Sequence, residues 1–270
     1  TNDSGAGSLR QAIANAAPGD TIAFAPGLTG TITLTSGELL INKNLTLIGP
    51  GAASLAISGN DASRVFRISG VTVSIYGVTI RDGNAADGGG ISNAGTLTLN
   101  NVIVTDNAAT DDGGGIYNNT GGALTLTDVT ISSNTATGNG GGIYVYDGTV
   151  TVTGVTIHGN TASNKGGGIC NNGTATLVNV TISGNTAGTG GGGIYNKYTV
   201  TLTNVTISNN SGDGFLQDGY SYTSATLKNT LIANNTAANC HLNKVLVSQG
   251  HNLSSDSSCA AVFTAAGDLN

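Results

Sequence analysis

Residues 111–119 read DDGGGIYNN, and the string GGGI within this stretch occurs five times along the chain. Successive copies are separated by 25, 27, 26 and 25 residues, counted between their closing isoleucines: Ile91, Ile116, Ile143, Ile169 and Ile194. A second string, as in VTISSN and VTISGN, recurs between the copies. A repeat of about 25 residues cannot bury its own apolar face, so we expect the copies to stack on one another.

When the copies are aligned, three further positions are aliphatic in almost every copy, and mostly polar residues alternate with them. This period of two is typical of a β-strand with one buried face. We predict that these positions, like the five isoleucines, point inward. The three sets are Ile75, Leu99, Leu126, Val152, Leu177, Leu202 and Leu227; Val78, Val102, Val129, Val155, Val180, Val205 and Thr230; and Ile80, Val104, Ile131, Ile157, Ile182, Ile207 and Ile232.

Two polar columns indicate where the backbone turns. The first contains only Gly, Asn and Asp, which tolerate a positive φ angle, so we expect a left-handed corner in every copy. The second is all asparagine and is interpreted in the same way, with side chains that can also hydrogen-bond along the stack. Its members are Asn107, Asn134, Asn160, Asn185, Asn210 and Asn235. Short strands joined by such corners form one coil of a β-solenoid, with roughly ten coils spaced at about 4.8 Å.

The N-terminal segment departs from the repeat. Ser8 can cap a short amphipathic helix over residues 9–16, and a helix there would cover the open end of the first coil. We therefore expect one domain over residues 1–270, with a cap at residues 1–20 and coils at residues 21–239.

Residues 240–270 lose the repeat and are expected to form an irregular last coil or a C-terminal cap. Two of the three cysteines, Cys240 and Cys259, lie in this segment. They either form a disulfide or remain free, because connectivity does not follow from sequence alone.

Composition limits the kinds of partner. The formal net charge is −6, which argues against DNA or RNA because a nucleic-acid partner needs a basic face. No apolar run is long enough to span a bilayer as a helix. The sequence contains no Met, so we expect a processed or excised segment of a longer protein.

The repeat strings resemble those of bacterial cell-surface proteins. Pairs such as GGGI…ISSN are similar to the GGAI and FxxN repeats of chlamydial polymorphic outer-membrane proteins. The opening DSGAGSLRQAIANAAPGDTIAF resembles the start of secreted β-helix proteins that carry a CSLREA motif, although that literal string is absent. The resemblance implies an all-β, single-stranded right-handed parallel β-helix, similar to that of pectate lyases, with a short N-terminal capping helix. It also implies a secreted or cell-surface location.

The glycine triplet is interpreted as scaffold rather than as a phosphate loop. A phosphate loop needs a Lys-Ser or Lys-Thr pair and a helix after its glycines, whereas consecutive glycines at a corner let neighbouring turns pack closely. The aspartates beside the triplet are a separate candidate. Asp87, Asp111 and Asp112 would lie near one another in adjacent coils, where like charges repel. A bound Ca²⁺ would relieve that repulsion; the alternative is a set of solvated turn carboxylates, and no other cofactor is indicated.

An enzyme is an alternative, because proteins of this fold include lyases and hydrolases of acidic polysaccharides. Acid–base chemistry needs two or three suitable groups that converge on one face. The candidates are few: Arg81 beside Asp82, and His158 where other coils carry serine. The remaining basic residues look scattered along the repeat. We therefore name no catalytic residue.

Two outward columns are candidate ligand faces. One is a threonine array that resembles the ice-binding faces of β-solenoid antifreeze proteins, although threonine is also a favoured outward residue of any strand. Its members are Thr98, Thr125, Thr151, Thr176 and Thr201. The other contains Tyr117, Tyr144 and Tyr195, which form either an exposed ladder on which sugar rings pack or an ordinary packed corner.

The sequence thus favours a non-catalytic extracellular module that acts as a rigid surface or adhesion scaffold. Its expected partners are a surface glycan, a surface protein or further copies associated along the solenoid. A polysaccharide lyase or hydrolase and an ice-binding protein are the alternatives.

Overall fold

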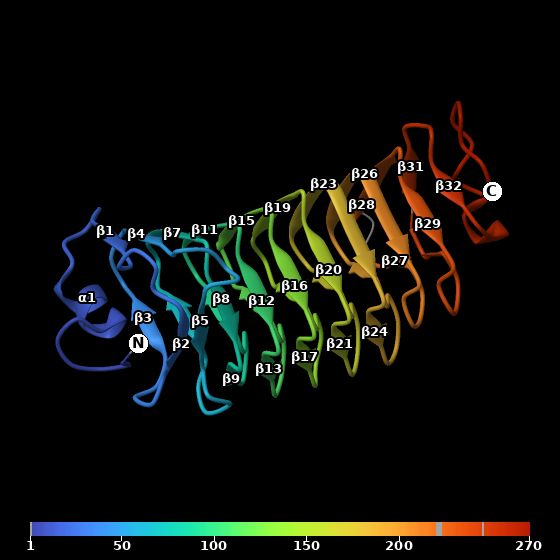
Figure 1. Cartoon of the computed structure of the whole chain (residues 1–270). Helices are drawn as coiled ribbons and strands as arrows, with labels where there is room; N and C mark the ends of the chain where they lie inside the picture. The colour runs from blue at the N-terminus through green and yellow to red at the C-terminus, as the bar shows by residue number, and fades with distance from the viewer. Residues whose placement is uncertain (1, 220–222, 245) are drawn as a thin grey trace.

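The computed structural model describes residues 2–219, 223–244 and 246–270. The chain winds into an elongated right-handed parallel β-helix, with the N-terminus at one end and the C-terminus at the other (Figure 1). Equivalent residues of successive coils pair in register: Ile116 pairs with Ile91 on one side and with Ile143 on the other. The predicted fold class is therefore confirmed.

Two of the three sheets each form one side of the solenoid. The nine-stranded sheet contains β3 (Leu39–Ile41), β6 (Phe66–Ile68), β10 (Ile91–Asn93), β14 (Ile116–Asn118), β18 (Ile143–Val145), β22 (Ile169–Asn171), β25 (Ile194–Asn196), β27 (Phe215–Gln217) and β30 (Cys240–Leu242). The five-stranded sheet contains β9 (Asn84–Ala85), β13 (Ala108–Ala109), β17 (Thr135–Ala136), β21 (Thr161–Ala162) and β24 (Thr186–Ala187).

The third sheet has 18 strands in two adjoining rows, which the long strands β23 (Thr174–Ser183) and β26 (Thr199–Ser208) join. The first row contains β1 (Thr21–Ala23), β4 (Leu45–Ile48), β7 (Thr72–Tyr76), β11 (Thr96–Asn100), β15 (Ala123–Thr127), β19 (Thr149–Thr153), β28 (Ser224–Lys228) and β31 (Leu246–Ser248). The second contains β2 (Gly30–Thr33), β5 (Leu55–Ser58), β8 (Thr79–Arg81), β12 (Ile103–Thr105), β16 (Thr130–Ser132), β20 (Thr156–His158), β29 (Leu231–Ala233) and β32 (Leu253–Ser254).

One continuous apolar core fills the solenoid from Leu9 in the cap to Phe263 near the C-terminus. All four columns that were predicted to point inward are buried in it, including Thr230, the polar member of its column. Since each coil packs against the coils before and after it, the coils stabilise one another as a stack.

The corners are left-handed at the predicted Gly/Asn/Asp column. Its seven members have φ between 49° and 66°: Gly77, Asn101, Asp128, Gly154, Asn179, Asn204 and Asn229. The same interpretation is wrong for the asparagine column, because the positive φ falls one residue earlier, for example at Asp106 and Ser133. Asparagine is present in this column for its side-chain amide, as the hydrogen bonds show.

The asparagine column forms a buried hydrogen-bonded ladder. The Nδ2 atom of Asn107 donates to Oδ1 of Asn134 over 2.9 Å, and the same bond links each member to the next as far as Asn235. A second, shorter ladder in the nine-stranded sheet joins Asn171 to Asn196 and Asn196 to Gln217. These bonds satisfy asparagine amides that would otherwise be costly to bury, whereas Nε2 of Gln217 has no partner among the described residues.

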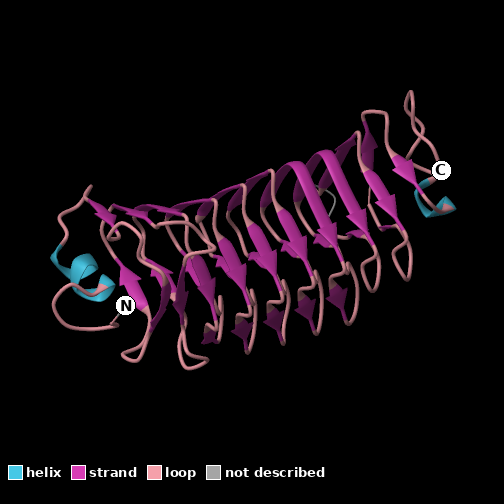
Figure 2. Ribbon diagram, viewed as in Figure 1, coloured by secondary structure: helices cyan, strands magenta, loops and turns pink. Residues whose placement is uncertain are grey.

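Helical segments lie at the two ends of the solenoid (Figure 2). Helix α1 (Leu9–Asn15) begins after the N-cap Ser8, whose Oγ accepts a hydrogen bond from the backbone N–H of Gln11, and it buries Leu9 and Ile13 against the first coil. Arg10 fixes this cap by donating to Asp3 and to the backbone carbonyls of Gly37 and Glu38.

At the other end, β30 to β32 continue the coils, and the 3-10 helix η1 (Ser257–Cys259) follows them. Cys240 and Cys259 form a disulfide across this end, with their Cα atoms 5.1 Å apart. In the part of the chain that the structure describes, no helix has the length and apolar character needed to cross a bilayer.

Candidate ligand-binding groove

The glycine corners are built for close packing of backbone. A Cβ atom on Gly114 would lie 2.5 Å from the carbonyl oxygen of Thr135 and 2.6 Å from that of Gly141. The N–H groups of Gly113, Gly114 and Gly115 donate to carbonyl oxygens of the next coil at 2.9–3.1 Å. Because these N–H groups already have partners, they are not a cradle for a phosphate, and DDGGGIYNN is scaffold in its glycine part.

The aspartates beside the triplet do not converge as a ligand set. Asp112 accepts two hydrogen bonds on one carboxylate oxygen, from the backbone N–H and the side-chain amide of Asn139, and Asp87 accepts one from the backbone N–H of Asp112. Among the described residues, no three His, Cys, Asp or Glu side chains lie close enough to hold a metal ion. The expected Ca²⁺ site at Asp87, Asp111 and Asp112 therefore has no geometric support.

The pKa of Asp112 is raised, because burial and the neighbouring charges of Asp111 and Asp87 disfavour its ionised form. Two hydrogen bonds from Asn139 act in the opposite direction and lower the pKa. The same three carboxylates contribute, after burial, to raising the pKa of Tyr117 to about 12. The potential at this part of the surface is therefore negative and disfavours a further anion.

The outward column of the nine-stranded sheet reads Tyr117, Tyr144, Cys170, Tyr195 and Leu216, in register. Tyr144 and Tyr195 are only 5% and 4% exposed, and with Cys170 and Leu216 they form a small apolar cluster outside the main core. Of the two alternatives for this column, the packed corner therefore applies to these two rings. Tyr117 is half-buried and stacks on Tyr144 with ring centroids 5.4 Å apart.

A groove of about 370 Å³ lies over this cluster. Its floor is formed by Tyr144, Cys170 and Tyr195, and Cys170 is the small residue between two large ones. Every coil crosses the floor in the same direction, so residues before the strands form one wall and residues after them form the other. The first wall carries Asn139, Asn164, Lys165 and Thr189, and the second carries Asn172 and Lys197.

Hydrogen bonds fix the side chains that line this groove. Lys165 Nζ lies 3.0 Å from the Tyr195 hydroxyl and 4.4 Å from the centre of its ring, and that hydroxyl donates to Asp218. The hydrogen bond from Tyr195 lowers the pKa of Asp218 more than any other contact does. Asn172 donates to the Tyr144 hydroxyl over 2.8 Å, while its own Oδ1 is buried and has no hydrogen-bond partner among the described residues.

These side chains can recognise a polar ring. Amide, hydroxyl and ammonium groups supply both donors and acceptors, as the hydroxyls of a sugar require. Burial raises the pKa of the Cys170 thiol, so this cysteine is a protonated, unreactive floor residue at neutral pH.

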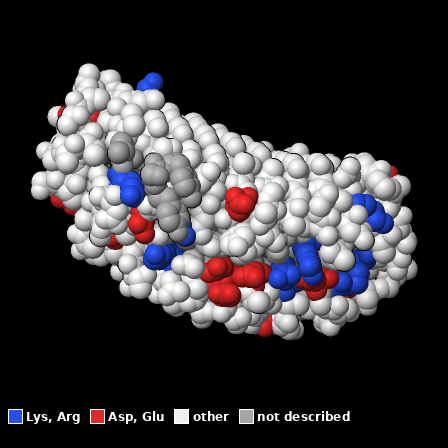
Figure 3. Space-filling view, turned by 180° about the vertical axis from the view of Figure 1, so that it is seen from behind, with Lys and Arg blue, Asp and Glu red and all other residues white. Residues whose placement is uncertain are grey.

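Charged side chains gather in a band along one side of the molecule (Figure 3). Near its N-terminal end, Glu38 pairs with both Arg64 and Arg67, and Arg64 also donates to the backbone carbonyls of Asp87 and Gly88. Basic residues that look scattered in the sequence are thus organised around this side. The sequence feature that could have indicated this arrangement is the column before the glycine triplets, which changes from Asp87 and Asp112 to Lys165.

The other residues considered for catalysis lie elsewhere. Arg81 and Asp82 pair with each other at 3.2 Å, and Asp82 also accepts from Ser58. His158 is exposed on β20, in register with Ser132 and Ser183. The structure does not bring these side chains to the groove.

The threonine column Thr98, Thr125, Thr151, Thr176 and Thr201 is in register across the 18-stranded sheet, and Thr226 continues it. Ice binding through this face stays a prediction. Thermal hysteresis of the wild type, compared with a Thr151→Tyr variant that disrupts the regular face, is the measurement that decides it.

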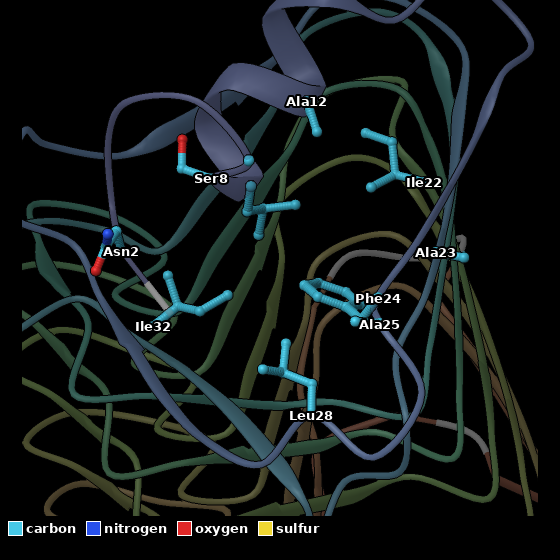
Figure 4. Close-up of a pocket in the computed structure, with 11 residues that line it drawn as sticks. Asn2, Ser8, Ala12, Ile22, Ala23, Phe24, Ala25, Leu28 and Ile32 are labelled. Atoms are coloured by element: carbon cyan, nitrogen blue, oxygen red, sulfur yellow. The ribbon is translucent and has the colours of Figure 1, made fainter.

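A further cavity of about 220 Å³ lies between α1 and the first coil (Figure 4). Aliphatic and aromatic side chains such as Ile22, Phe24 and Leu28 point into it, and the described residues that line it include no titratable side chain. It is a gap in the packing of the cap.

Comparison with known proteins agrees with this architecture. Residues 35–187 match the family described as right handed beta helix region, which covers more than half of the chain. The chain belongs to the right-handed β-helix family. Residues 179–197 also match the Chlamydia polymorphic membrane protein repeat. Among curated proteins, none matches this sequence.

Among solved structures, this β-helix is similar to the pectate lyase Pel9A, with a TM-score of 0.66 and 16% identity over 92% of this chain and 70% of that chain. At this identity the likeness shows the fold alone. Weaker similarities are to ORF18 of Geobacillus virus E2, at a TM-score of 0.40, 15% identity and coverage of 91% and 57%, and to the PL6 family alginate lyase AlyGC, at 0.25, 14% and coverage of 90% and 49%. These two scores carry no argument about function.

Proposed function

We propose that this β-helix is a rigid extracellular or cell-surface module that binds a glycan in the groove over Tyr144, Cys170 and Tyr195 without cleaving it. The observation that carries the proposal is the groove itself, where two lysines and three asparagines surround a floor with one small residue. The continuous core supports the rigidity of the module, because sites on a regular scaffold hold their geometry better than sites on isolated loops.

The lining favours binding over hydrolysis. Among the described residues that form the groove there is no Asp or Glu, whereas a glycosidase needs two carboxyl groups on either side of the bond to be broken. The groups present instead are hydrogen-bond donors and acceptors in fixed positions. The extracellular location is supported by the polymorphic membrane protein repeat and by the fold similarity to a pectate lyase.

A glycan array followed by calorimetry tests the proposal. The decisive variant is Cys170→Tyr, which places on the floor the residue that neighbouring coils carry and fills the groove. We expect the wild type to bind at least one glycan class and Cys170→Tyr to lose it while melting at a similar temperature. Lys228→Ala, at the end of β28 in another sheet, is the matched surface control. Binding that survives in Cys170→Tyr, or no binding by the wild type, would refute the proposal.

A polysaccharide lyase is the second candidate, and one contact favours it. Lys165 and Tyr195 lie side by side in the groove at 3.0 Å, and an amine beside a phenol can remove and return a proton. Incubation with pectate and alginate, followed by the absorbance of unsaturated products, separates the two candidates. A product signal that disappears in Lys165→Met would establish the lyase; a flat signal with intact glycan binding supports the binding module.

A further inference from the structure

The column of residues before the glycine corners changes charge along the helix axis, from Asp112 just outside the groove to Asn139 and Lys165 on its wall. Asp112, Asn139 and Lys165 are equivalent residues of successive coils, because the glycine after each donates its N–H to the carbonyl oxygen of the equivalent residue in the next coil: Gly113 to Asn139 and Gly140 to Lys165, both at 2.9 Å. Each step is one coil, about 4.8 Å. An acidic, a neutral and a basic side chain thus follow one another within about 10 Å.

Each of these three residues flanks one position of the outward column. Asp112 precedes Tyr117 in its coil, Asn139 precedes Tyr144, and Lys165 precedes Cys170. On the opposite wall, Asn172 follows Cys170, Lys197 follows Tyr195 one coil further along, and Asp218, which accepts from the Tyr195 hydroxyl, comes one coil after Lys197. Among the described residues that line the groove, Lys165 and Lys197 are the charged ones, and they flank Cys170 and Tyr195, whereas the position over Tyr117 lies beside a carboxylate with two more nearby.

Charges at this spacing attract or repel a charged ligand strongly enough to select it, because they lie within the screening length of physiological salt and burial lessens that screening further. An anionic group is attracted over Cys170 and repelled over Tyr117. A chain with a carboxylate on every ring would place at least one of them beside Asp112.

We propose that the groove takes an oligosaccharide with a single anionic ring at its end, which lies over Cys170 between Lys165 and Lys197, while neutral rings extend over Tyr144 and Tyr117. This inference rests on the proposed glycan binding and narrows it. A sugar ring in an extended chain occupies a length close to one coil, so three rings span Cys170 and Tyr144 on the floor and Tyr117 in the coil just beyond it. The buried Oδ1 of Asn172, which has no hydrogen-bond partner among the described residues, accepts a hydroxyl of the first ring.

Calorimetry with four matched trisaccharides tests the inference. The probes are one with a carboxylate on its terminal ring only (sialyllactose), one with a sulfate on its terminal ring only, a neutral one (maltotriose) and trigalacturonate, which has a carboxylate on every ring. We expect the two singly charged probes to bind at least about tenfold more tightly than the neutral one. The difference between carboxylate and sulfate identifies the natural anion. Trigalacturonate should bind more weakly than either despite its greater charge.

Three charge-removing variants locate the effect. Lys165→Met keeps the aliphatic stem, and we expect it to erase the preference for singly charged over neutral probes; Lys197→Met serves as an independent second variant. Asp111→Asn removes an exposed charge near Tyr117, away from the two lysines, and should improve the binding of trigalacturonate alone. Melting temperatures verify that the variants are folded.

The outcomes separate this inference from the proposed function. Binding of the neutral probe as tightly as the singly charged ones, or tightest binding of trigalacturonate, would overturn the inference while glycan binding stands. Failure of the wild type to bind any glycan would refute both.

Discussion

Asn134 and Asn160, in adjacent coils, are joined by a hydrogen bond of 2.9 Å from Nδ2 to Oδ1, and neither side chain is exposed. Asn160 also accepts from the backbone N–H of Asn134 and donates to Ile131, to His158 and to Asn185. One amide therefore satisfies groups in three coils. It links the coils at a corner where the strands themselves do not pair.

The first prediction follows from this ladder. In Asn160→Ala, two donors of Asn134 and several buried carbonyl oxygens lose a partner, and each unsatisfied group costs about 1–3 kcal/mol. We expect the free energy of unfolding to fall by about 2–4 kcal/mol, measured by urea denaturation. Thr151→Ala on an exposed strand face is the control and should change stability by less than about 0.5 kcal/mol. Equal effects of the two substitutions would show that the ladder adds nothing.

The second prediction concerns the glycine corners and uses one substitution at two left-handed glycines. Gly88 and Gly121 have φ of 62° and 70°, which asparagine also tolerates. A Cβ atom on Gly88 would lie 2.3 Å from the carbonyl oxygen of Ile91, whereas no atom lies within 4 Å of one on Gly121. We expect Gly88→Asn to destabilise by about 1–3 kcal/mol and Gly121→Asn to be nearly neutral. Similar melting temperatures for the two variants would contradict the role of close packing.

The disulfide provides the third prediction. Cys240 and Cys259 are 19 residues apart, and on the chain-entropy model a loop of that size stabilises by about 3 kcal/mol. A Cys240→Ser, Cys259→Ser double variant should unfold first at the C-terminal end, which hydrogen exchange can locate. Reductant should lower the melting temperature of the wild type and leave the double variant unchanged. If the fully reduced wild type melts at the same temperature as the oxidised protein, the disulfide makes no such contribution.

The fold could be predicted from the sequence because its causes repeat. Aliphatic residues such as Ile116 and Ile143 occupy the same position in every coil, and the left-handed corner accepts only Gly, Asn or Asp. The prediction of a positive φ in the asparagine column is wrong, since Asn107 belongs to the amide ladder while its neighbour Asp106 adopts the positive φ. Both columns consist of turn-forming residue types, so composition alone does not tell them apart.

The groove was harder to predict because its residues do not repeat. Lys165 is the only lysine in the column Asp87, Asp112, Asn139 and Lys165, and Lys197 is the only lysine in the column Asn119, Tyr146, Asn172 and Lys197. The groove depends on the two columns lying on opposite sides of the same strands. The change from Asp112 to Lys165 in one column was visible in the sequence, but its meaning requires the register and the opposite wall.

The fourth prediction concerns Asp112, whose pKa is raised by burial first and then by Asp111 and Asp87. A carboxyl with a raised folded-state pKa contributes stability below its ordinary pKa of 3.8, and this is lost as the pH rises through the raised value. At neutral pH the charge is therefore unfavourable. Asp112→Asn keeps an oxygen that can accept from Asn139, so we expect a higher melting temperature than the wild type at neutral pH. The difference should disappear at acidic pH; an equal shift at both would point to packing instead.

The fifth prediction concerns Asp218, whose pKa is lowered, chiefly by the hydrogen bond from Tyr195. A carboxyl with a lowered folded-state pKa contributes stability above its ordinary pKa of 3.8, and this is lost as the pH falls through the lowered value. Asp218→Asn should therefore melt below the wild type at neutral pH, with the gap closing below pH 3.8. Asp147→Asn, at an exposed position, is the matched control and should melt close to the wild type at neutral pH. If the gap for Asp218→Asn is constant with pH, then the Tyr195 contact stabilises the fold without depending on the charge, and the electrostatic account of this end of the groove is wrong.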